Sequence, residues 1–178
     1  MPAESIMTTG SYSAAETLRD GRSLEIRALR PDDRDGLLAA VARTGEQSLY
    51  RRFFTFKRSF TDREIDFFIN VDFVSHVALV AVLKENGQST IVGGARYVLA
   101  KPGRAEVAFA VDDEHQRQGI GAALLRHLSG IAREAGLLEL IAEVLPDNAA
   151  MLKVFGKSGL EVATRRGTDV VHVVLRLS

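Results

Sequence analysis

The chain has 178 residues, of which 46% are hydrophobic and 26% are charged, so its composition is that of an ordinary globular domain. The 23 Lys and Arg residues balance the 23 Asp and Glu residues, and the resulting net charge of zero disfavours nucleic acid or an anionic membrane as a partner. Cysteine is absent, which excludes disulfides, zinc sites with Cys ligands and thiolate catalysis.

The first residues of the chain carry no targeting signal. Residues 1–20 lack the basic and apolar segments of a secretory signal, and we find no stretch long and uncharged enough to span a membrane. We therefore expect a cytoplasmic protein. Residues 1–20 are rich in Ser, Thr, Ala and Glu without a clear period, which predicts a mobile tail before a single domain over residues 21–178.

The first part of the domain combines one strand with short helices. Alternating apolar residues predict a strand over residues 24–28, which Pro31 ends. Two acidic residues then favour the start of a helix, whose apolar positions at residues 37–41 recur at helical spacing. A short helix is predicted over residues 46–54. Residues 61–64 have the spacing of a capping box, so they predict the start of another helix.

The remainder of the chain alternates strands with two longer helices. Three strand-like runs are separated by good turn sequences and predict an antiparallel meander. Together the elements predict an α/β fold, with a mixed, mainly antiparallel sheet of about seven strands flanked by helices. The expected strands cover residues 76–83, 91–99, 105–111, 137–144, 160–165 and 170–177, and the expected helices cover residues 119–135 and 146–157.

Residues 116–122, Gln-Arg-Gln-Gly-Ile-Gly-Ala, follow a predicted strand and run directly into a predicted helix. Glycines let backbone N–H groups approach an anion, and a helix N-terminus carries about half a positive charge. The segment therefore predicts a diphosphate site formed by the main chain, with a plain glycine-containing helix start as the alternative. A dinucleotide fingerprint would need a third glycine where Leu124 stands, and the P-loop pattern is also absent.

Gln116, Gly119 and Gly121 match the signature Gln/Arg-x-x-Gly-x-Gly/Ala of the GNAT superfamily of acetyl-CoA-dependent N-acetyltransferases, which this sequence resembles over residues 24–177. Residues 48–54 and 143–148 also resemble the acetyltransferase domain of bacterial Pat-type protein lysine acetyltransferases. The resemblance implies the GNAT fold, acetyl-CoA as co-substrate and an amine acceptor. A protein lysine is the leading acceptor, and a small-molecule amine is the alternative.

The resemblance also implies where coenzyme A binds. Its diphosphate would lie on the amides of the glycine-containing loop, and its pantetheine arm would lie between the strands over residues 105–111 and 137–144, which would splay apart. Asn148 has the alternative role of a helix N-cap. Arg117 and Lys153 are candidates for the 3'-phosphate or else solvated cations. The implied cofactor-binding residues are Phe109, Val111, Gln116, Arg117, Gln118, Gly119, Ile120, Gly121, Ala122, Asn148, Met151 and Phe155.

Acetylation of an amine requires a base, because an alkylammonium with a pKa of about 10.4 is protonated at neutral pH and cannot attack a thioester. GNAT enzymes with a glutamate base commonly carry it in the strand before the signature loop, which implies Glu106 here. On a regular strand Glu106 shares a face with two alanines, leaving space for substrate. Alternatively, Glu106 faces solvent or pairs with Arg104 or Arg96, and His115 is a competing base.

Phe155 departs from the family pattern. Many GNAT enzymes carry a tyrosine at this position as the acid that protonates the departing thiolate, and a phenyl ring cannot do so. This departure motivates a second interpretation, a catalytically silent acyl-CoA-binding module. The histidines show no metal-ligand spacing, so no metal site is expected. The expected partners are the amine acceptor and, as one option, a second copy of the chain in a homodimer.

Overall fold

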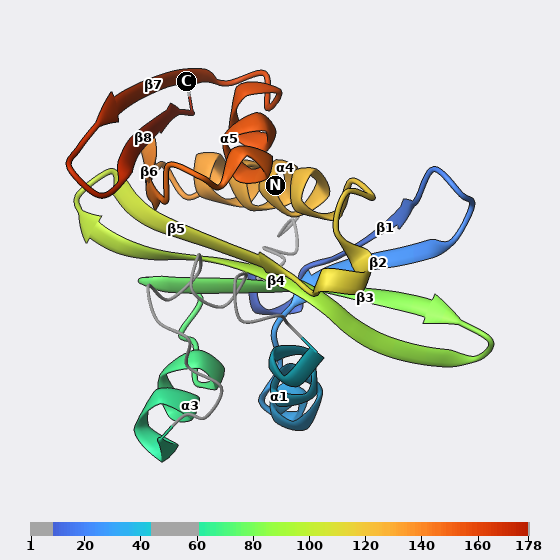
Figure 1. The fold of residues 1–178 in the computed structure, drawn as a ribbon. Coiled ribbons are helices and arrows are strands. Elements are labelled where there is room, and N and C mark those ends of the chain that lie inside the picture. The colour runs from blue at the N-terminus through green and yellow to red at the C-terminus, as the bar shows by residue number, and fades with distance from the viewer. Residues whose placement is uncertain (1–8, 44–60, 178) are drawn as a thin grey trace, which may run out of the picture.

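The computed structural model describes residues 9–43 and 61–177, and their strands form a single sheet (Figure 1). The strand order is β1-β2-β3-β4-β5-β6-β8-β7. Neighbouring strands are antiparallel except β5 and β6, which run parallel. The strands are β1 (Ser13–Thr17), β2 (Ser23–Ala28), β3 (His76–Glu85), β4 (Gln88–Lys101), β5 (Arg104–Val111), β6 (Glu139–Val144), β7 (Glu161–Arg166) and β8 (Val171–Arg176).

Helices cover both faces of this sheet. Figure 1 shows α4 and α5 on one face and α1 and α3 on the other. This arrangement of helices on a mainly antiparallel sheet confirms the predicted fold class. The helices are α1 (Arg34–Arg43), α3 (Asp62–Ile69), α4 (Ile120–Glu134) and α5 (Ala149–Gly156), and 3-10 turns lie at Thr9–Ser11, Pro31–Asp33 and Asp113–His115.

The sheet of the described residues has 8 strands rather than about seven, because Ser13–Thr17 form β1. The predicted mobile tail is therefore wrong for this segment. The strand pairs with β2, and Tyr12 and Glu16 contact His127 of α4. Tyr12 Oη lies 2.5 Å from Nδ1 of His127, and Glu16 Oε1 lies 2.6 Å from Nε2. The helix predicted over residues 46–54 lies outside the described residues.

The core consists of two layers, one on each face of the sheet. The larger layer packs α4 and α5 against the strands and includes Leu124, Leu128 and Phe155, each at most 1% exposed. The smaller layer lies between β3 and the opposite helices and includes Val80 and Ile69. Complete burial of each such side chain contributes about 1.5–3 kcal/mol. The two layers fix the sheet between its helices, and hence the position of β5.

Thr61 and Glu64 form the predicted capping box at the start of α3. The Glu64 N–H donates to Thr61 Oγ1 (3.2 Å), and the Thr61 N–H donates to Glu64 Oε1 (3.3 Å). These bonds satisfy backbone donors that a helix start otherwise leaves without partners. The local signal in the sequence therefore located this helix correctly.

A buried ion pair joins the end of β2 to the turn before α1. Arg27 donates two hydrogen bonds to the Asp33 carboxylate, at 2.7 and 2.8 Å, and the Arg30 N–H donates a third at 2.7 Å. Burial raises the pKa of Asp33, but the hydrogen bonds from Arg27 and Arg30 outweigh it, so the pKa lies below its ordinary value of 3.8. Asp33 is thus held as a carboxylate in the folded protein.

Candidate active site

A cleft opens where β5 and β6 separate. Their parallel pairing covers Arg104, Ala105 and Glu106 opposite Glu139, Leu140 and Ile141, and no pair follows, although β5 continues to Val111. The predicted splay of these strands is therefore confirmed. Beyond Glu106, the β5 edge that faces β6 lacks a strand partner, so its backbone groups are open to a ligand, except the Val111 carbonyl oxygen, which accepts a hydrogen bond from Gln116.

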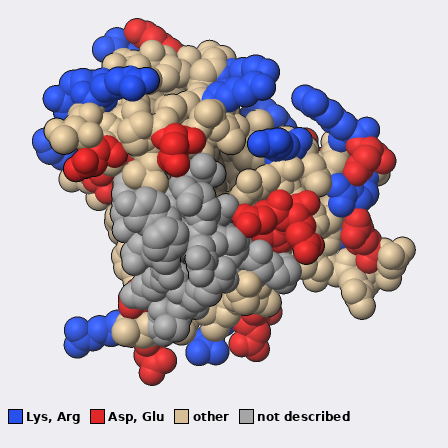
Figure 2. Space-filling model, in the orientation of Figure 1, with Lys and Arg blue, Asp and Glu red and all other residues tan. Residues whose placement is uncertain are grey.

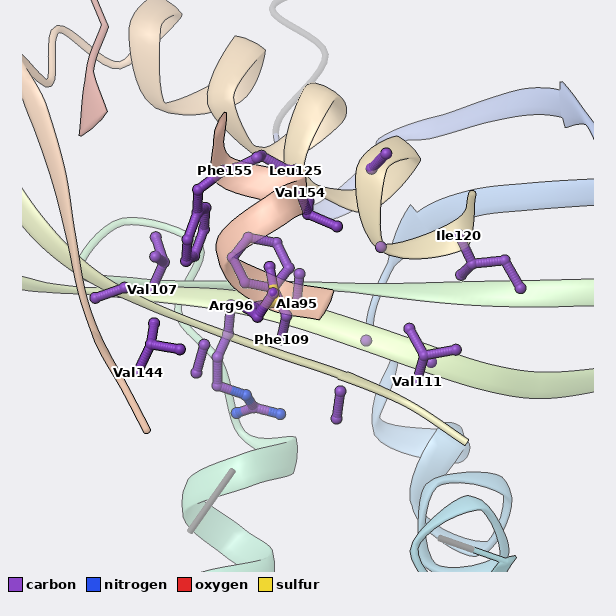
Figure 3. Close-up of a pocket in the computed structure, with 18 of the residues that line it drawn as sticks. Ala95, Arg96, Val107, Phe109, Val111, Ile120, Leu125, Val144, Val154 and Phe155 are labelled. Carbon is purple, nitrogen blue, oxygen red and sulfur yellow. The ribbon is translucent and has the colours of Figure 1, made fainter. Parts of the chain in front are cut away.

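The cleft passes from one face of the sheet to the other. It is lined by Val107 and Phe109 on the face that carries α5, and by Glu106 and Ala108 on the opposite face. Figure 3 shows apolar side chains of β5, α4 and α5 converging around its upper part. Its volume of about 1630 Å³ exceeds the roughly 300–1,000 Å³ of single-ligand pockets, so it can admit two substrates.

The glycine-containing loop forms one end of this cleft. Gly119 is the N-cap of α4 and has φ +86°, and Arg117 has φ +64°. A Cβ atom at Gly119 would meet nothing within 4 Å, so the space beside this residue is open. The first N–H groups of α4, from Ile120 to Ala122, precede the intrahelical bonds and can bind an anion. This geometry fits a diphosphate.

The side chains of Gln116 and Gln118 are engaged within the protein. Gln116 Nε2 donates to the Val111 carbonyl oxygen (3.1 Å), which ties the loop to the end of β5. Gln118 Oε1 accepts a hydrogen bond from Arg22 (2.6 Å), and Gln118 is absent from the cleft lining. If these two residues contact the cofactor as the resemblance implies, they do so through their backbone groups.

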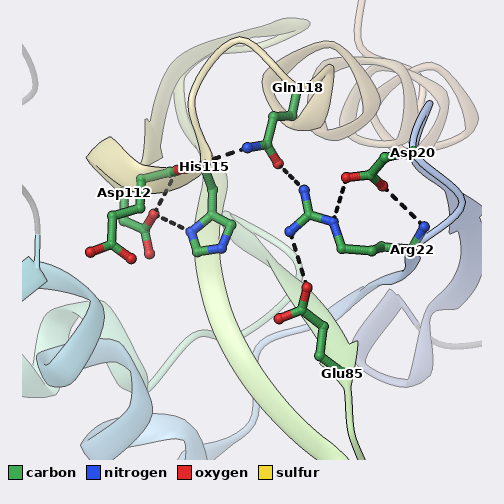
Figure 4. Close-up of polar contacts among 7 residues, drawn as sticks. Asp20, Arg22, Glu85, Asp112, His115 and Gln118 are labelled. Atoms are coloured by element: carbon green, nitrogen blue, oxygen red, sulfur yellow. Dashed lines mark hydrogen bonds and ion pairs between the residues drawn. The ribbon is translucent and has the colours of Figure 1, made fainter.

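His115 belongs to the same loop and is held by a buried carboxylate. The backbone N–H of His115 donates to Asp112 Oδ1 (3.1 Å), and its ring Nδ1 lies 2.5 Å from the same oxygen (Figure 4). The Asp112 side chain is 1% exposed. A base must lie beside the thioester, which the extended pantetheine arm separates from the diphosphate. His115 lies in the loop where the resemblance implies the diphosphate, and this position disfavours it as the base.

Glu106 lies at the point where the strands separate, and it is exposed to the cleft. Neither alternative ion pair forms: Arg104 pairs with Glu139 at 2.7 Å, and Arg96 donates to the Phe68 carbonyl oxygen at 3.3 Å. Among the described residues, no hydrogen bond or ion pair engages the Glu106 carboxylate. Its carboxylate is therefore available to a proton or an ammonium group.

Arg96, which the sequence suggested only as an alternative partner of Glu106, instead fixes α3 beside the cleft. Its guanidinium lies over the Phe68 ring, 4.9 Å from the centroid, and 3.0 Å from Nε2 of His76. Arg96 is opposite Ala108 in the β4–β5 register, so it shares the face of Glu106. Its role depends on contacts with distant parts of the chain, which no local pattern indicates.

Helix α5 closes the other side of the cleft. Asn148 caps this helix by accepting a hydrogen bond from the Met151 N–H (3.3 Å), so its alternative role as an N-cap is confirmed, and both residues line the cleft. Phe155 is 1% exposed and packs edge-on against Phe109, with ring centroids 6.0 Å apart. Tyr97 is buried in the core, away from the cleft lining, and supplies no replacement for the missing tyrosine acid.

Exposed basic side chains lie among acidic ones on the face of the molecule that Figure 2 shows. Figure 2 shows Lys and Arg gathered over the half that carries α5 and β7. Of the candidates for a phosphate contact, Arg117 and Lys153 are both exposed and line the cleft.

Within residues 9–43 and 61–177, no cluster of three His, Asp or Glu side chains could bind a metal ion. No helix in these ranges combines the length and apolarity needed to cross a membrane.

Comparison with known proteins identifies the family. Residues 44–160 match the acetyltransferase (GNAT) family. The chain belongs to the GNAT family of acetyltransferases. It is 30% identical to an acetyltransferase of Pseudomonas aeruginosa over 92% of this chain and 88% of that protein. It is also 31% identical to the acetyltransferase Pat of Mycolicibacterium smegmatis, over 80% of this chain and 42% of that longer protein.

A solved structure supports the same assignment. The GNAT domain of Pat from S. lividans has a TM-score of 0.83 and 32% identity, and the match covers 92% of this chain and 96% of that one. The predicted resemblance to GNAT enzymes and to Pat domains is therefore confirmed. As a GNAT enzyme, the chain is an N-acetyltransferase that uses acetyl-CoA.

Proposed function

We propose that this GNAT enzyme transfers the acetyl group of acetyl-CoA directly to a primary amine, with Glu106 as general base. The observation that carries the proposal is the carboxylate of Glu106, which lies without a partner among the described residues at the point where β5 and β6 separate. It faces a cleft that joins the two faces of the sheet. An amine and a thioester can therefore approach each other from opposite sides.

The positions of the loop and of Glu106 suit the length of the co-substrate. From Val111 to Glu106 an extended strand runs roughly 17 Å at about 3.3 Å per residue. The first amides of α4 would hold the diphosphate beside Gly119, and the open edge of β5 would bind the pantetheine arm along this distance. Acetyl-CoA supplies the activated acetyl group as a thioester. Its reactive end would then lie toward Glu106.

Glu106 would act on the acceptor amine. Its carboxylate accepts a proton from the ammonium, directly or through water, and the neutral amine then attacks the thioester carbonyl. The C–N bond forms, the C–S bond breaks, and coenzyme A leaves as a thiolate that takes a proton from water, because Phe155 has no proton to donate. A backbone N–H on the open edge of β5, on the side of Glu106, would stabilise the developing oxyanion. The sequence has no cysteine for a covalent acetyl-enzyme formed through a thiolate, which favours direct transfer.

A protein lysine is the proposed acceptor. The support is the similarity to Pat over most of this chain, together with the 32% identity to the GNAT domain of S. lividans Pat. A small-molecule amine is the alternative acceptor. Measuring release of coenzyme A thiol with lysine peptides, polyamines and aminoglycosides separates these classes. Turnover only with polyamines or aminoglycosides would overturn the lysine assignment, and failure with every amine would favour a silent acyl-CoA-binding module.

The role of the base is tested by Glu106→Gln. We expect transfer at pH 7 to slow by roughly 10²-fold or more while coenzyme A affinity is retained, because the amide keeps the shape but cannot accept the proton. Between pH 7 and pH 9 the rate of the variant should recover about a hundredfold, because the free-amine fraction of a group with a pKa of about 10.4 rises by that factor.

The matched control is Glu161→Gln, which removes an exposed carboxylate on β7 that pairs with Arg176 at 3.4 Å. It should keep the wild-type rate and pH profile. An unchanged rate at pH 7 for Glu106→Gln would remove Glu106 from the mechanism.

A further inference from the structure

We propose that Arg22 is a positioning residue for the cofactor loop. Arg22 lies just before β2, at the turn that follows β1, whereas the loop lies 96 residues later in the chain. Figure 4 shows the Arg22 guanidinium between Gln118 of the loop, Asp20 of its own turn and Glu85 at the end of β3. The inference rests on the proposed function, in which the loop binds the diphosphate of coenzyme A.

The contacts of Arg22 use three separate groups of the guanidinium. One terminal nitrogen donates to Gln118 Oε1 at 2.6 Å, the other lies 3.1 Å from Glu85 Oε1, and Nε donates to Asp20 Oδ2 at 2.7 Å. The Arg22 N–H also donates to Asp20, at 3.1 Å. One carboxylate of its own turn and one at the end of β3 thus fix the direction in which the guanidinium meets Gln118, and the Arg22 side chain is only 27% exposed.

Gln118 is the point at which the loop needs support. It stands between Arg117 and Gly119, which both have positive φ, at +64° and +86°. The left-handed conformation of a residue such as Arg117 costs of order 1 kcal/mol and persists only when surrounding contacts enforce it. Gln118 Nε2 donates to the Glu114 carbonyl oxygen (3.3 Å), while Oε1 accepts from Arg22. The amide thereby links the turn of the loop to the strands β2 and β3.

The first half of the loop has its own anchors. The Asp112 carboxylate binds His115, and Gln116 Nε2 donates to the Val111 carbonyl oxygen, so this half is tied to β5. Arg22 acts on the second half, next to the amides that open α4. An arginine that holds these amides in their binding geometry lowers the cost of ordering the loop when a diphosphate binds.

The proposal predicts a selective loss of affinity for the co-substrate. In Arg22→Met the hydrogen bond to Gln118 is lost, and we expect the Kd for coenzyme A to rise about five- to tenfold, the scale of the net contribution of one typical hydrogen bond. The KM for acetyl-CoA should rise by a similar factor. The kcat and the KM for the acceptor should stay at wild-type values, because Arg22 lies outside the cleft lining and remote from Glu106.

The experiment is a double-mutant cycle measured by calorimetric titration of coenzyme A into the full chain. Arg22→Met and Gln118→Ala should each weaken binding, and the double variant should bind no more weakly than the poorer single variant. Arg176→Met is the control, because it removes an exposed ion pair with Glu161 at the opposite edge of the sheet. It should leave the Kd unchanged.

The affinity for coenzyme A and the coupling between the two substitutions distinguish the positioning role from the proposed function. If Arg22→Met binds coenzyme A as wild type does, or if the two substitutions add independently, the positioning role is overturned and the proposed function stands. If wild type binds coenzyme A and shows the coupling but transfers acetyl to no amine, the proposed function fails and the positioning role stands. If wild type binds no coenzyme A, both are overturned.

Discussion

Gly119 and Gly136 lie at opposite ends of α4 and offer a matched pair for testing the cofactor loop. Both have φ +86°, and a Cβ atom at either would meet nothing within 4 Å. Substitution by alanine therefore imposes the same left-handed strain at each position without a steric clash inside the protein. The two sites differ in surroundings, because Gly119 lines the cleft and Gly136 does not.

The shared strain sets the expected magnitude. An alanine in the left-handed region costs about 1–2 kcal/mol. For a chain of this size, that lowers the melting temperature by roughly 2–8 °C in either variant. In Gly119→Ala the loop can also relieve the strain by adopting conformations that no longer present the amides to the diphosphate. A strain of 1–2 kcal/mol reduces the population of the binding-competent loop conformation by a factor of about 5–30. The apparent Kd for coenzyme A rises by the same factor.

The assay combines thermal unfolding with calorimetric titration of coenzyme A for wild type, Gly119→Ala and Gly136→Ala. We expect similar losses of melting temperature in the two variants and a weaker Kd only in Gly119→Ala. Wild-type affinity for coenzyme A in both variants would show that the loop beside Gly119 does not hold the ligand. Weaker binding in both would attribute the effect to α4 as a whole.

Two further predictions concern stability. Asp33→Asn leaves the Arg27 guanidinium without its carboxylate at a site where the two side chains are 11% and 8% exposed, so we expect a loss of about 3–5 kcal/mol, or roughly 6–20 °C in melting temperature. Because the folded-state pKa of Asp33 is lowered, the ion pair contributes its full stability above the ordinary pKa of 3.8 and loses it as pH falls through the folded-state pKa. The melting temperatures of wild type and variant should therefore converge in acid. A constant difference in melting temperature down to pH 2 would contradict this. Asn148→Ala should cost about 1 kcal/mol by removing the cap of α5, and Asn148→Asp should restore it in denaturant titrations; equal losses in both would argue against capping.

The elements that the sequence predicted well are those with local signals. The capping box at Thr61 and Glu64 acts within one helical turn, so its residues alone locate the start of α3. The strands of the meander also matched, because turn sequences bound them and their residues are apolar. β1 was missed because its residues are small or polar, and because the contact of Glu16 with His127 joins residues 111 positions apart.

The candidate site divides in the same way. The glycines of the loop indicated the start of α4, where Gly119 is the N-cap and lines the cleft, since their spacing reflects backbone geometry. The availability of the Glu106 carboxylate could not be predicted, because it depends on Glu139 engaging Arg104 and on α3 engaging Arg96. The contact between Arg22 and Gln118 joins residues 96 positions apart, and neither residue carries a pattern that names the other.

The separation of β5 from β6 has a consequence for how this enzyme can change over evolution. Under the proposed function, the open edge of β5 binds the co-substrate through backbone N–H and C=O groups. Every residue except proline provides both groups. The β5 side chains on the sheet face away from α5, such as Ala108 and Ala110, can then vary without weakening the binding of the co-substrate. New acceptors can be acquired by substitutions on this face, while the nucleotide remains recognised by an invariant scaffold of amides.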